Sequence, residues 1–247
     1  MRKLLTICYD GTNYCGWQVQ PNGITVQQVI LEKLSAIMSD CKGVTGCSRT
    51  DSGVHANMYC LHFDTESNIP NKNIVNALNS MLPFDISALS CEDVDEDFHA
   101  RYSCTAKEYV YKIYNGEIRN PFKEKYYLHI KEYIDCDVLN KSCQMFLGEH
   151  DFSAFCASGS SVKTTVRNIY DCSIERFGED VIFRITGDGF LYNMVRIIVG
   201  TLLDINNGKI EWDDIPKIIE SKDRKNAGKT AKPTGLYLNK VYYGEVK

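Results

Sequence analysis

The chain has 247 residues, 44% of them hydrophobic and 24% charged, which is typical of a globular protein with one large domain or two modest ones. It has no run of eighteen apolar residues, and the apolar run near its start is too short for a signal peptide, so we expect neither a membrane span nor secretion. The net charge of −4 weighs weakly against a nucleic-acid partner, but charge acts locally, and the acidic stretch 90–98 is separate from the basic stretch 221–232.

The first half of the chain predicts the element order βαββαβ. T-x-x-Q from Thr25 to Gln28 is a capping box, in which the two side chains satisfy free backbone N–H groups, so a helix begins there. A second helix ends before Pro83. The expected strands are residues 3–9, 43–48, 56–63 and 86–91, and the expected helices are residues 25–38 and 71–82. This is the order of the split βαβ unit of ferredoxin-like domains.

The second half repeats this order with insertions but without repeating the sequence. Asp135 is the expected N-cap of one helix, which extends to about Leu147. The expected strands are residues 107–115, 166–177, 180–186 and 235–243, and the other expected helices are residues 190–204 and a short one from Asp213. We therefore predict an α+β protein of two ferredoxin-like βαββαβ lobes with mainly antiparallel sheets, residues 1–103 and 104–247, flanking a central catalytic cleft.

Eleven cysteines are scattered singly from Cys8 to Cys172. None forms a C-x-x-C pair, and no histidine stands at a zinc-ligand spacing from them. This pattern is typical of reduced, mostly buried thiols in a cytoplasmic protein, and it gives no indication of a metal site.

The stretch "GCSRTDSGVHA" (residues 46–56) contains Asp51-Ser52-Gly53, the order in which aspartic proteases present a catalytic carboxylate. Such a protease needs two of these loops, and no second copy exists in the chain, so this reading requires a symmetric dimer. Asp-Ser-Gly is equally favoured in ordinary tight turns. A site is favoured because the loop joins two central strands and brings Arg49 and His55 close to Asp51.

Arg196 stands out within the helix "FLYNMVRIIVGTLL", which is apolar almost all round and is expected to be buried. Arginine is rarely buried without a partner, because its desolvation is costly. Either Arg196 reaches a surface along its aliphatic stem or it pairs with a carboxylate, for which Asp51 is a candidate.

Aromatic residues on the strand "KEYVYKIYN" (residues 107–115) leave a third class open, a noncatalytic RNA-binding module with a ferredoxin-like sheet. This strand does not match the RNP1 pattern of such modules, and such a module has no need of the R-T-D sequence around Asp51. The strand pattern alone indicates that Tyr109 is an aromatic residue on a half-buried strand, with no particular function.

Several segments, taken in order, resemble the tRNA pseudouridine synthase A family over nearly the whole chain. They are "YDGTNYCGWQ", "TVQQVIL", "GCSRTDSGVHA", "FHARYSCTAKEYVYKIYN", "DFSAF", "TVRNIY", "GFLYNMVRIIVG" and "GLYL". The G-x-x-R-T-D-x-G-V-H-A segment is highly specific, and the Y-x-G-W and M-V-R segments support it. The chain departs from the family at none of the positions that carry the chemistry.

The resemblance implies that the chain isomerises uridine to pseudouridine in the anticodon stem-loop of tRNA, at tRNA positions 38, 39 and 40, as a homodimer without metal or cofactor. It implies that Asp51 is the catalytic aspartate and Tyr109 the tyrosine that contacts the target base. It also implies that Arg196 pairs with the aspartate and that Arg49 helps to flip the nucleotide out of the stem.

Overall fold

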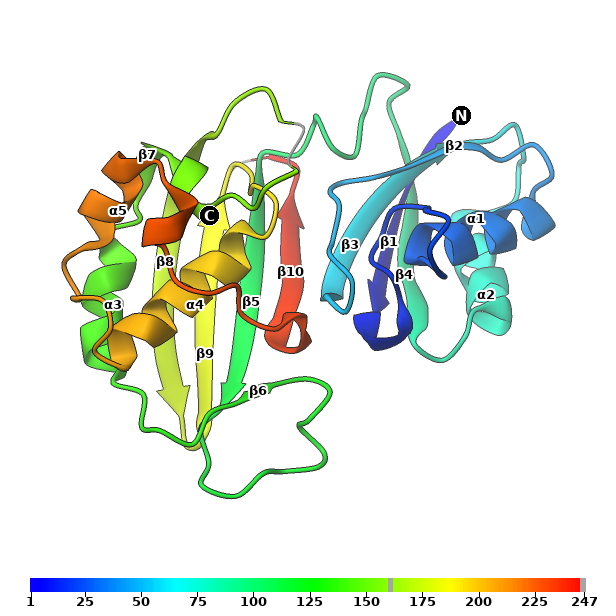
Figure 1. Cartoon of the computed structure of the whole chain (residues 1–247). Helices are drawn as coiled ribbons and strands as arrows, with labels where there is room; N and C mark the ends of the chain where they lie inside the picture. The colour runs from blue at the N-terminus through cyan, green and yellow to red at the C-terminus, as the bar shows by residue number, and fades with distance from the viewer. Residues whose placement is uncertain (160–161, 245–247) are drawn as a thin grey trace. The chain divides into compact units, whose positions relative to one another are not determined.

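The computed structural model describes residues 1–159 and 162–244, and the chain divides into two units (Figure 1). Unit 1 comprises Met1–Thr105 together with the segment that begins at Tyr237, and unit 2 comprises Ala106–Leu236. No helix of the described residues is both long and apolar enough to cross a membrane. The α+β class and the mainly antiparallel strand pairing are confirmed.

Unit 1 is a sheet in the order β4-β1-β3-β10, with β2 paired to β3. Its strands are β1 (Arg2–Tyr9), β2 (Lys42–Gly46), β3 (His55–Asp64), β4 (Ile86–Val94) and β10 (Leu236–Tyr242), and its helices are α1 (Val26–Ile37) and α2 (Asn71–Met81). Both helices lie on the same side of this sheet (Figure 1). They bury apolar side chains such as Ile30 and Leu78 against Leu5 and Ile7 of β1, which are fully buried.

Local signals account for the helix ends in both units. The Thr25 hydroxyl accepts a hydrogen bond from the Gln28 backbone N–H at 3.4 Å, as the expected cap requires. Asp135 caps α3 in the same way, by accepting from the N–H groups of Asp137 and Val138 at 3.1 Å. The predicted caps therefore position the first helix of each half.

Unit 2 is a sheet in the order β5-β9-β8-β7, with β6 paired to β5. Its strands are β5 (Ala106–Tyr114), β6 (Leu128–His129), β7 (Gly148–Asp151), β8 (Val166–Phe177) and β9 (Asp180–Gly187), and its helices are α3 (Cys136–Gln144), α4 (Met194–Asn206) and α5 (Ile215–Ser221). All three helices lie on one side of the sheet (Figure 1). Gly178, with φ at +62°, forms the expected turn between β8 and β9.

One expectation, the start of α4, differs from the structure. Helix α4 begins at Met194 and not at Phe190, because Asn193 adopts a left-handed conformation (φ +59°) that a right-handed helix cannot contain. The segment 235–243, expected as the closing strand of the second lobe, forms the strand β10. Within unit 1, β10 also pairs in parallel with β3, Tyr237 opposite His55 and Leu238 opposite Ala56, and the sequence did not indicate this pairing. An Asn57–Asn239 side-chain hydrogen bond of 2.7 Å holds the same pair of strands.

Candidate active site

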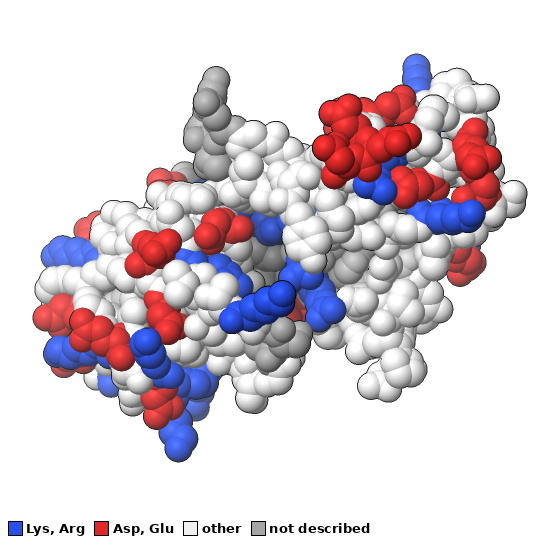
Figure 2. Space-filling view, turned by 90° about the horizontal axis from the view of Figure 1, so that it is seen from above, with Lys and Arg blue, Asp and Glu red and all other residues white. Residues whose placement is uncertain are grey.

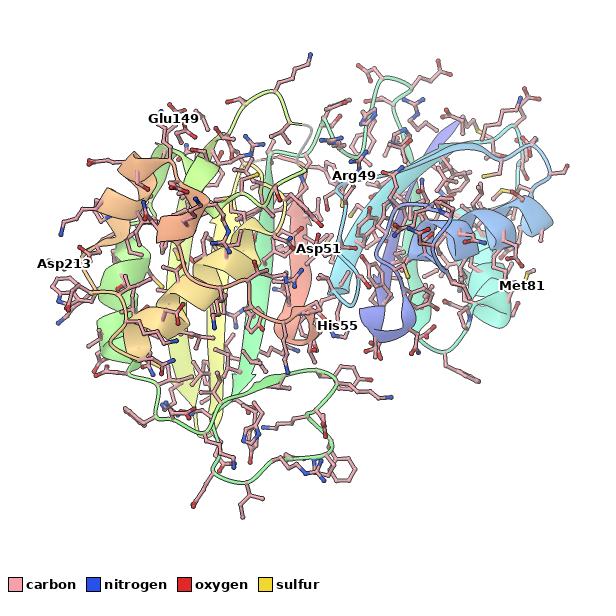
Figure 3. The ribbon with its side chains drawn as sticks, viewed as in Figure 1. Arg49, Asp51, His55, Met81, Glu149 and Asp213 are labelled. Carbon is pink, nitrogen blue, oxygen red and sulfur yellow. The ribbon has the colours of Figure 1, made fainter. Side chains whose placement is uncertain are left out.

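Asp51 lies in the loop that joins β2 to β3, within unit 1, and its side chain is half-buried (Figure 3). The Val54 N–H donates to the Asp51 carbonyl oxygen at 3.2 Å, which closes a tight turn. Gly53 supplies the positive φ of +77° that this turn requires. The turn interpretation of Asp-Ser-Gly is therefore correct as a description of the backbone, and it leaves the chemical role of the carboxylate open.

The segment Tyr9–Trp17, which follows β1, packs its backbone directly against this loop. A methyl group built on Gly11 would lie 2.0 Å from the Val54 carbonyl oxygen, and one on Gly16 would lie 2.4 Å from the Thr50 carbonyl oxygen. The Trp17 N–H donates to that same Thr50 oxygen at 3.2 Å. Only glycine permits these two close approaches, so the segment holds the loop by its backbone on both sides of Asp51.

Side chains reinforce the backbone contacts around the loop. The buried Tyr9 hydroxyl lies 2.9 Å from the Thr50 hydroxyl. Trp17 stacks on Tyr59 of β3, with ring centroids 4.1 Å apart and an interplanar angle of 28°. Tyr14 donates to an Asp85 carboxylate oxygen at 2.5 Å, and burial followed by this hydrogen bond raises the pKa of Tyr14. The residues beside Asp51 are thus fixed before any substrate binds.

His55 anchors the far end of the loop and is only 1% exposed. Its Nδ1 lies 3.0 Å from the Gly11 backbone nitrogen and also 3.0 Å from an Asp10 carboxylate oxygen. An unprotonated Nδ1 accepts from Gly11, whereas a protonated one donates to Asp10, so only one of the two bonds forms in a given protonation state. Its ring stacks on Tyr237 of β10 at 4.6 Å. His55 therefore fixes the segment around Gly11 to β3 and β10.

Arg49 is exposed, and its Nε donates to the Gln18 side-chain oxygen at 2.7 Å. The labelled side chains in Figure 3 mark the path of the chain from Arg49 through Asp51 to His55 at the start of β3. The hydrogen bonds hold Arg49 to Gln18 and His55 to Gly11 or Asp10, so each residue is fixed at its own end of the loop.

Tyr109 belongs to β5 of unit 2 and is 7% exposed. Its ring meets the edge of Phe190 at a centroid distance of 5.1 Å and an angle of 81°. Tyr111 lies two residues further on the same face of the strand and donates to the Lys232 carbonyl oxygen at 2.7 Å. Burial raises the pKa of Tyr111, and the nearby charge of Arg196 opposes that increase.

Arg196 lies in the first turn of α4 and is half-buried, whereas the helix around it is buried. Its Nε donates to the Ala231 carbonyl oxygen at 2.8 Å, and its Nη1 donates to the Asn193 side-chain oxygen at 2.6 Å. The Ala231 N–H donates in return to the Arg196 carbonyl oxygen at 3.0 Å. Two neighbours thus hold the guanidinium in a fixed orientation at the start of the helix.

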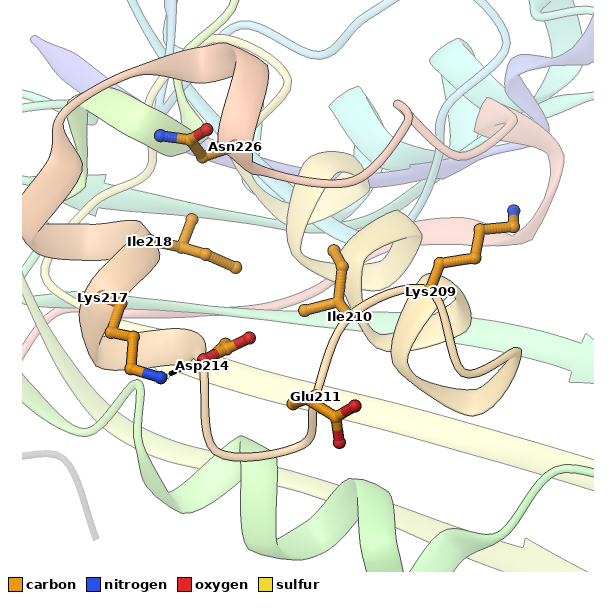
Figure 4. Close-up of a pocket in the computed structure, with 7 residues that line it drawn as sticks. All are labelled: Lys209, Ile210, Glu211, Asp214, Lys217, Ile218 and Asn226. Carbon is orange, nitrogen blue, oxygen red and sulfur yellow. Dashed lines mark hydrogen bonds and ion pairs between the residues drawn. The ribbon is translucent and has the colours of Figure 1, made fainter.

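No group of three or more His, Cys, Asp or Glu side chains within residues 1–159 and 162–244 is placed to hold a metal ion. All eleven cysteines are free thiols. An open pocket of about 330 Å³ lies beside α5, where the Lys217–Asp214 ion pair of 2.6 Å lines it (Figure 4). None of the expected site residues lines this pocket, so it is not the candidate active site.

Sequence reasoning selected Asp51 as a candidate but did not predict the residues that hold its loop. The glycines of "YDGTNYCGW" are the only sequence signal of the close approach at Gly11 and Gly16. Asn193, which orients Arg196 and ends the preceding loop, carried no signal beyond its type, because asparagine tolerates a left-handed backbone.

A family model described as tRNA pseudouridine synthase matches residues 6–103 and 142–244 of this chain. The chain is 49% identical over 244 residues to tRNA pseudouridine synthase A 2 of Clostridium perfringens, covering 98% of this chain and 100% of that protein. It is 50% identical over 239 residues to tRNA pseudouridine synthase A of Acetivibrio thermocellus, covering 97% and 98%. With that of Staphylococcus epidermidis it shares 44% over 242 residues, covering 98% and 91%.

Proposed function

The chain belongs to the tRNA pseudouridine synthase family, and from this membership we propose that it isomerises uridines in the anticodon stem-loop of tRNA with Asp51 as the nucleophile. An isomerase that acts on tRNA is what the family match establishes. The finer assignments, tRNA positions 38, 39 and 40 and the residue roles, rest on the resemblance of the R-T-D segment and on the way the chain holds it.

The single observation that carries the proposal is the close backbone packing around the loop that contains Asp51. Gly11 and Gly16 approach the carbonyl oxygens on either side of it, and neither position has room for a side chain. A half-buried carboxylate on a turn held this firmly suits a nucleophile, because covalent catalysis requires the attacking atom to be placed accurately. An ordinary surface turn has no need of such packing.

The reaction breaks the C1′–N1 bond, rotates the uracil and forms a C1′–C5 bond. The proton leaves C5, N1 ends with a proton, and neither electrons nor water are consumed, so the atoms balance without a redox cofactor. Asp51 would add to uracil C6 or to ribose C1′, or assist a route through a glycal that begins with loss of the C2′ proton. These three routes share the same requirement for a carboxylate at Asp51.

The other residues receive roles that fit their surroundings. Tyr109 presents an aromatic ring for the flipped uracil, in an orientation that the edge contact with Phe190 fixes. Arg196, oriented by Asn193 and Ala231, is proposed as the charge partner of Asp51, as the resemblance implies. Arg49, exposed beside the loop, is proposed to help displace the target nucleotide from the stem.

The same resemblance supports a homodimer in the cytoplasm. The eleven free thiols are consistent with a reducing compartment. Analytical ultracentrifugation at micromolar concentration tests the dimer directly, and a monomer there would contradict it.

Asp51→Asn tests the proposal. The variant keeps the size of the side chain and loses the nucleophile, so we expect it to fold and bind tRNA while its single-turnover rate falls by at least about 10³-fold. The measurement is pseudouridine formed in an unmodified tRNA transcript, located by mass spectrometry of the anticodon arm.

Asp95→Asn is the matched control, since Asp95 is exposed and lies outside the loop, and it should retain the wild-type rate. Substantial turnover by freshly purified Asp51→Asn would remove Asp51 from the mechanism. Wild-type product at a site outside the anticodon arm would overturn the proposed substrate position.

A further inference from the structure

Lys107, the second residue of β5, is 7% exposed. No other residue of the described chain gives its side chain a hydrogen bond, an ion pair or a ring contact. By contrast, the other lysine that is as deeply buried, Lys3, donates to Asp93 and to Asn71, each at 2.7 Å. A lysine with nine-tenths of its surface removed from water normally has such a partner.

The neighbours on β9 offer the Lys107 side chain no acceptor. Lys107 lies opposite Gly187, and the next two residues on its face of β5, Tyr109 and Tyr111, lie opposite Ile185 and Phe183. None of these cross-strand neighbours carries an acidic side chain. On the β9 side, this face of β5 therefore offers Lys107 apolar surface for its stem and no carboxylate for its ammonium group.

The ammonium group is nevertheless accessible to a ligand. Within residues 1–159 and 162–244, Ser153 Oγ is the one fully buried side-chain nitrogen or oxygen that lacks a partner. The Lys107 Nζ is thus not fully buried, although the aliphatic stem of the side chain is. An anion from outside can therefore reach a cation to which the described residues give no acceptor.

Lys107 and Tyr109 point to the same face of β5, because side chains two residues apart on a strand share a face. Their Cα atoms are about 7 Å apart, at about 3.4 Å per residue. A group that stacks on or beside Tyr109 therefore has its nearest attached groups within reach of the flexible Lys107 side chain.

We propose that Lys107 binds a backbone phosphate of the tRNA next to the uridine that Tyr109 contacts. The inference rests on the proposed role of Tyr109. A phosphate is favoured over a uracil carbonyl because only an anion neutralises the charge of an ammonium group that has no acidic partner, and a compact ammonium group suits a phosphate oxygen. Lys107 would then position the nucleotide by its backbone, while Tyr109 and Asp51 act on its base and sugar.

The test is the salt dependence of tRNA binding. Dissociation constants of an unmodified tRNA transcript are measured across a series of salt concentrations for wild type, Lys107→Met, Lys107→Gln and Lys107→Arg. Loss of one phosphate contact should reduce the slope of log Kd against log salt by about 1 and weaken low-salt affinity by roughly tenfold, whereas Lys107→Arg should keep the wild-type slope.

Lys72→Met, an exposed lysine on α2, is the matched control and should leave the slope unchanged. The proposal is overturned if Lys107→Met and Lys107→Gln keep the wild-type slope, or if Lys72→Met lowers the slope equally. A reduced single-turnover rate with an unchanged slope would place the contact on uracil and would also overturn it.

Folding is followed by thermal unfolding of each variant, and the two neutral variants should melt no lower than wild type, since no protein partner is lost. A large decrease in melting temperature for both would show a structural role and contradict the inference. A failure of the proposed function can be distinguished from a failure of this inference. If the proposed function is wrong, the wild-type protein forms no pseudouridine in the anticodon arm, whatever the salt dependence of the variants.

Discussion

At the level of single residues, Tyr109 combines a ring and a hydroxyl that can be separated experimentally. Tyr109→Phe keeps the ring and its edge contact with Phe190. In the route through a glycal, the Tyr109 hydroxyl would handle a proton while the ring stacks on uracil. We therefore expect tRNA affinity to be retained and the single-turnover rate to fall by about 10²-fold or more. Dissociation constants and single-turnover rates measure the two effects separately.

An unchanged rate for Tyr109→Phe would reduce Tyr109 to a stacking platform. Tyr109→Leu serves as the contrast, since it removes the ring as well and should lower both affinity and rate. Wild-type behaviour of the leucine variant would remove Tyr109 from the site altogether.

His62 of β3 gives a second residue-scale prediction, for the stability of the fold. It is 5% exposed, and its Nδ1 accepts a hydrogen bond from the Ala100 backbone N–H at 3.0 Å. This Nδ1 therefore carries no proton in the folded protein. Burial, with smaller contributions from the charges of Arg2 and His99, lowers its pKa from 6.5 to about 4. The unfolded chain therefore binds this proton near pH 6.5, whereas the folded protein binds it only near pH 4.

Because the unfolded state holds more protons in that window, stability decreases as the pH falls from about 6.5 towards 4, by at most about 1.4 kcal/mol per pH unit. His62→Gln keeps an acceptor for Ala100 and cannot titrate, so its stability should decrease less steeply. Urea unfolding of both proteins at pH 7, 6 and 5 gives the comparison. Parallel pH dependences would show that His62 does not contribute.

At the level of elements, the segment after β1 acts on the Asp51 loop through its backbone. Gly16→Ala places a methyl group 2.4 Å from the Thr50 carbonyl oxygen at a residue with φ +80°. The loop or the segment must shift, so we expect at least a tenfold loss in rate and a destabilisation of about 1–3 kcal/mol. Single-turnover kinetics and urea unfolding measure the two.

Gly159→Ala is the matched control for backbone strain alone, because Gly159 also has a positive φ (+87°) but its added methyl group meets nothing within 4 Å. It should lose less stability than Gly16→Ala and keep its rate. Equal effects of the two substitutions would mean that strain, and not the contact with the Asp51 loop, explains the result.

The elements that could be predicted from the sequence are those with local signals. Strand alternation and the caps at Thr25 and Asp135 depend on neighbouring residues, and the structure has them where they were expected. The pairing of β10 with β3 could not be predicted, because it joins residues 182 positions apart and leaves no local trace. The short strands β6 and β7 were also missed, since two and four residues show no periodicity.

The site was predictable to the same limited degree. The R-T-D segment made Asp51 the candidate through its resemblance to a family, whereas the contacts that hold the loop depend on the approach of two backbones. Spacing within the sequence does not record such an approach. For the same reason, the burial of Lys107 without a partner could be recognised only once its neighbours on β9 were known.

At the level of the whole molecule, charge is distributed unevenly: Figure 2 shows one dense cluster of acidic side chains and further acidic side chains scattered among basic ones on the rest of the face in view. The basic stretch 221–232 lies in unit 2 and is held against α4, where the Gly228 N–H donates to the Thr201 hydroxyl at 2.9 Å. Within it, Lys222 pairs with Asp151 at 3.0 Å, and Arg224 donates to the Ala227 carbonyl oxygen. Lys225 and Lys229 are exposed.

We therefore expect tRNA binding to weaken steeply with salt despite the net charge of −4. Reversing Lys225 and Lys229 to Glu should weaken binding and leave the single-turnover rate at saturating tRNA unchanged. Reversal of Lys222 or Arg224 would also remove structural contacts, so these two are poorer probes. A flat salt response, or a loss of rate without a loss of affinity, would contradict a phosphate-binding role for the stretch.

The placement of β10 also has a consequence for how the protein is made. The ribosome completes Thr105 and must then synthesise all of unit 2 before Tyr237 appears, which takes on the order of ten seconds at about 5–20 residues per second. During that interval β3 lacks its parallel neighbour, and His55 lacks the ring on which it stacks. A nascent chain therefore carries the Asp51 loop on an unfinished sheet until translation has passed β10.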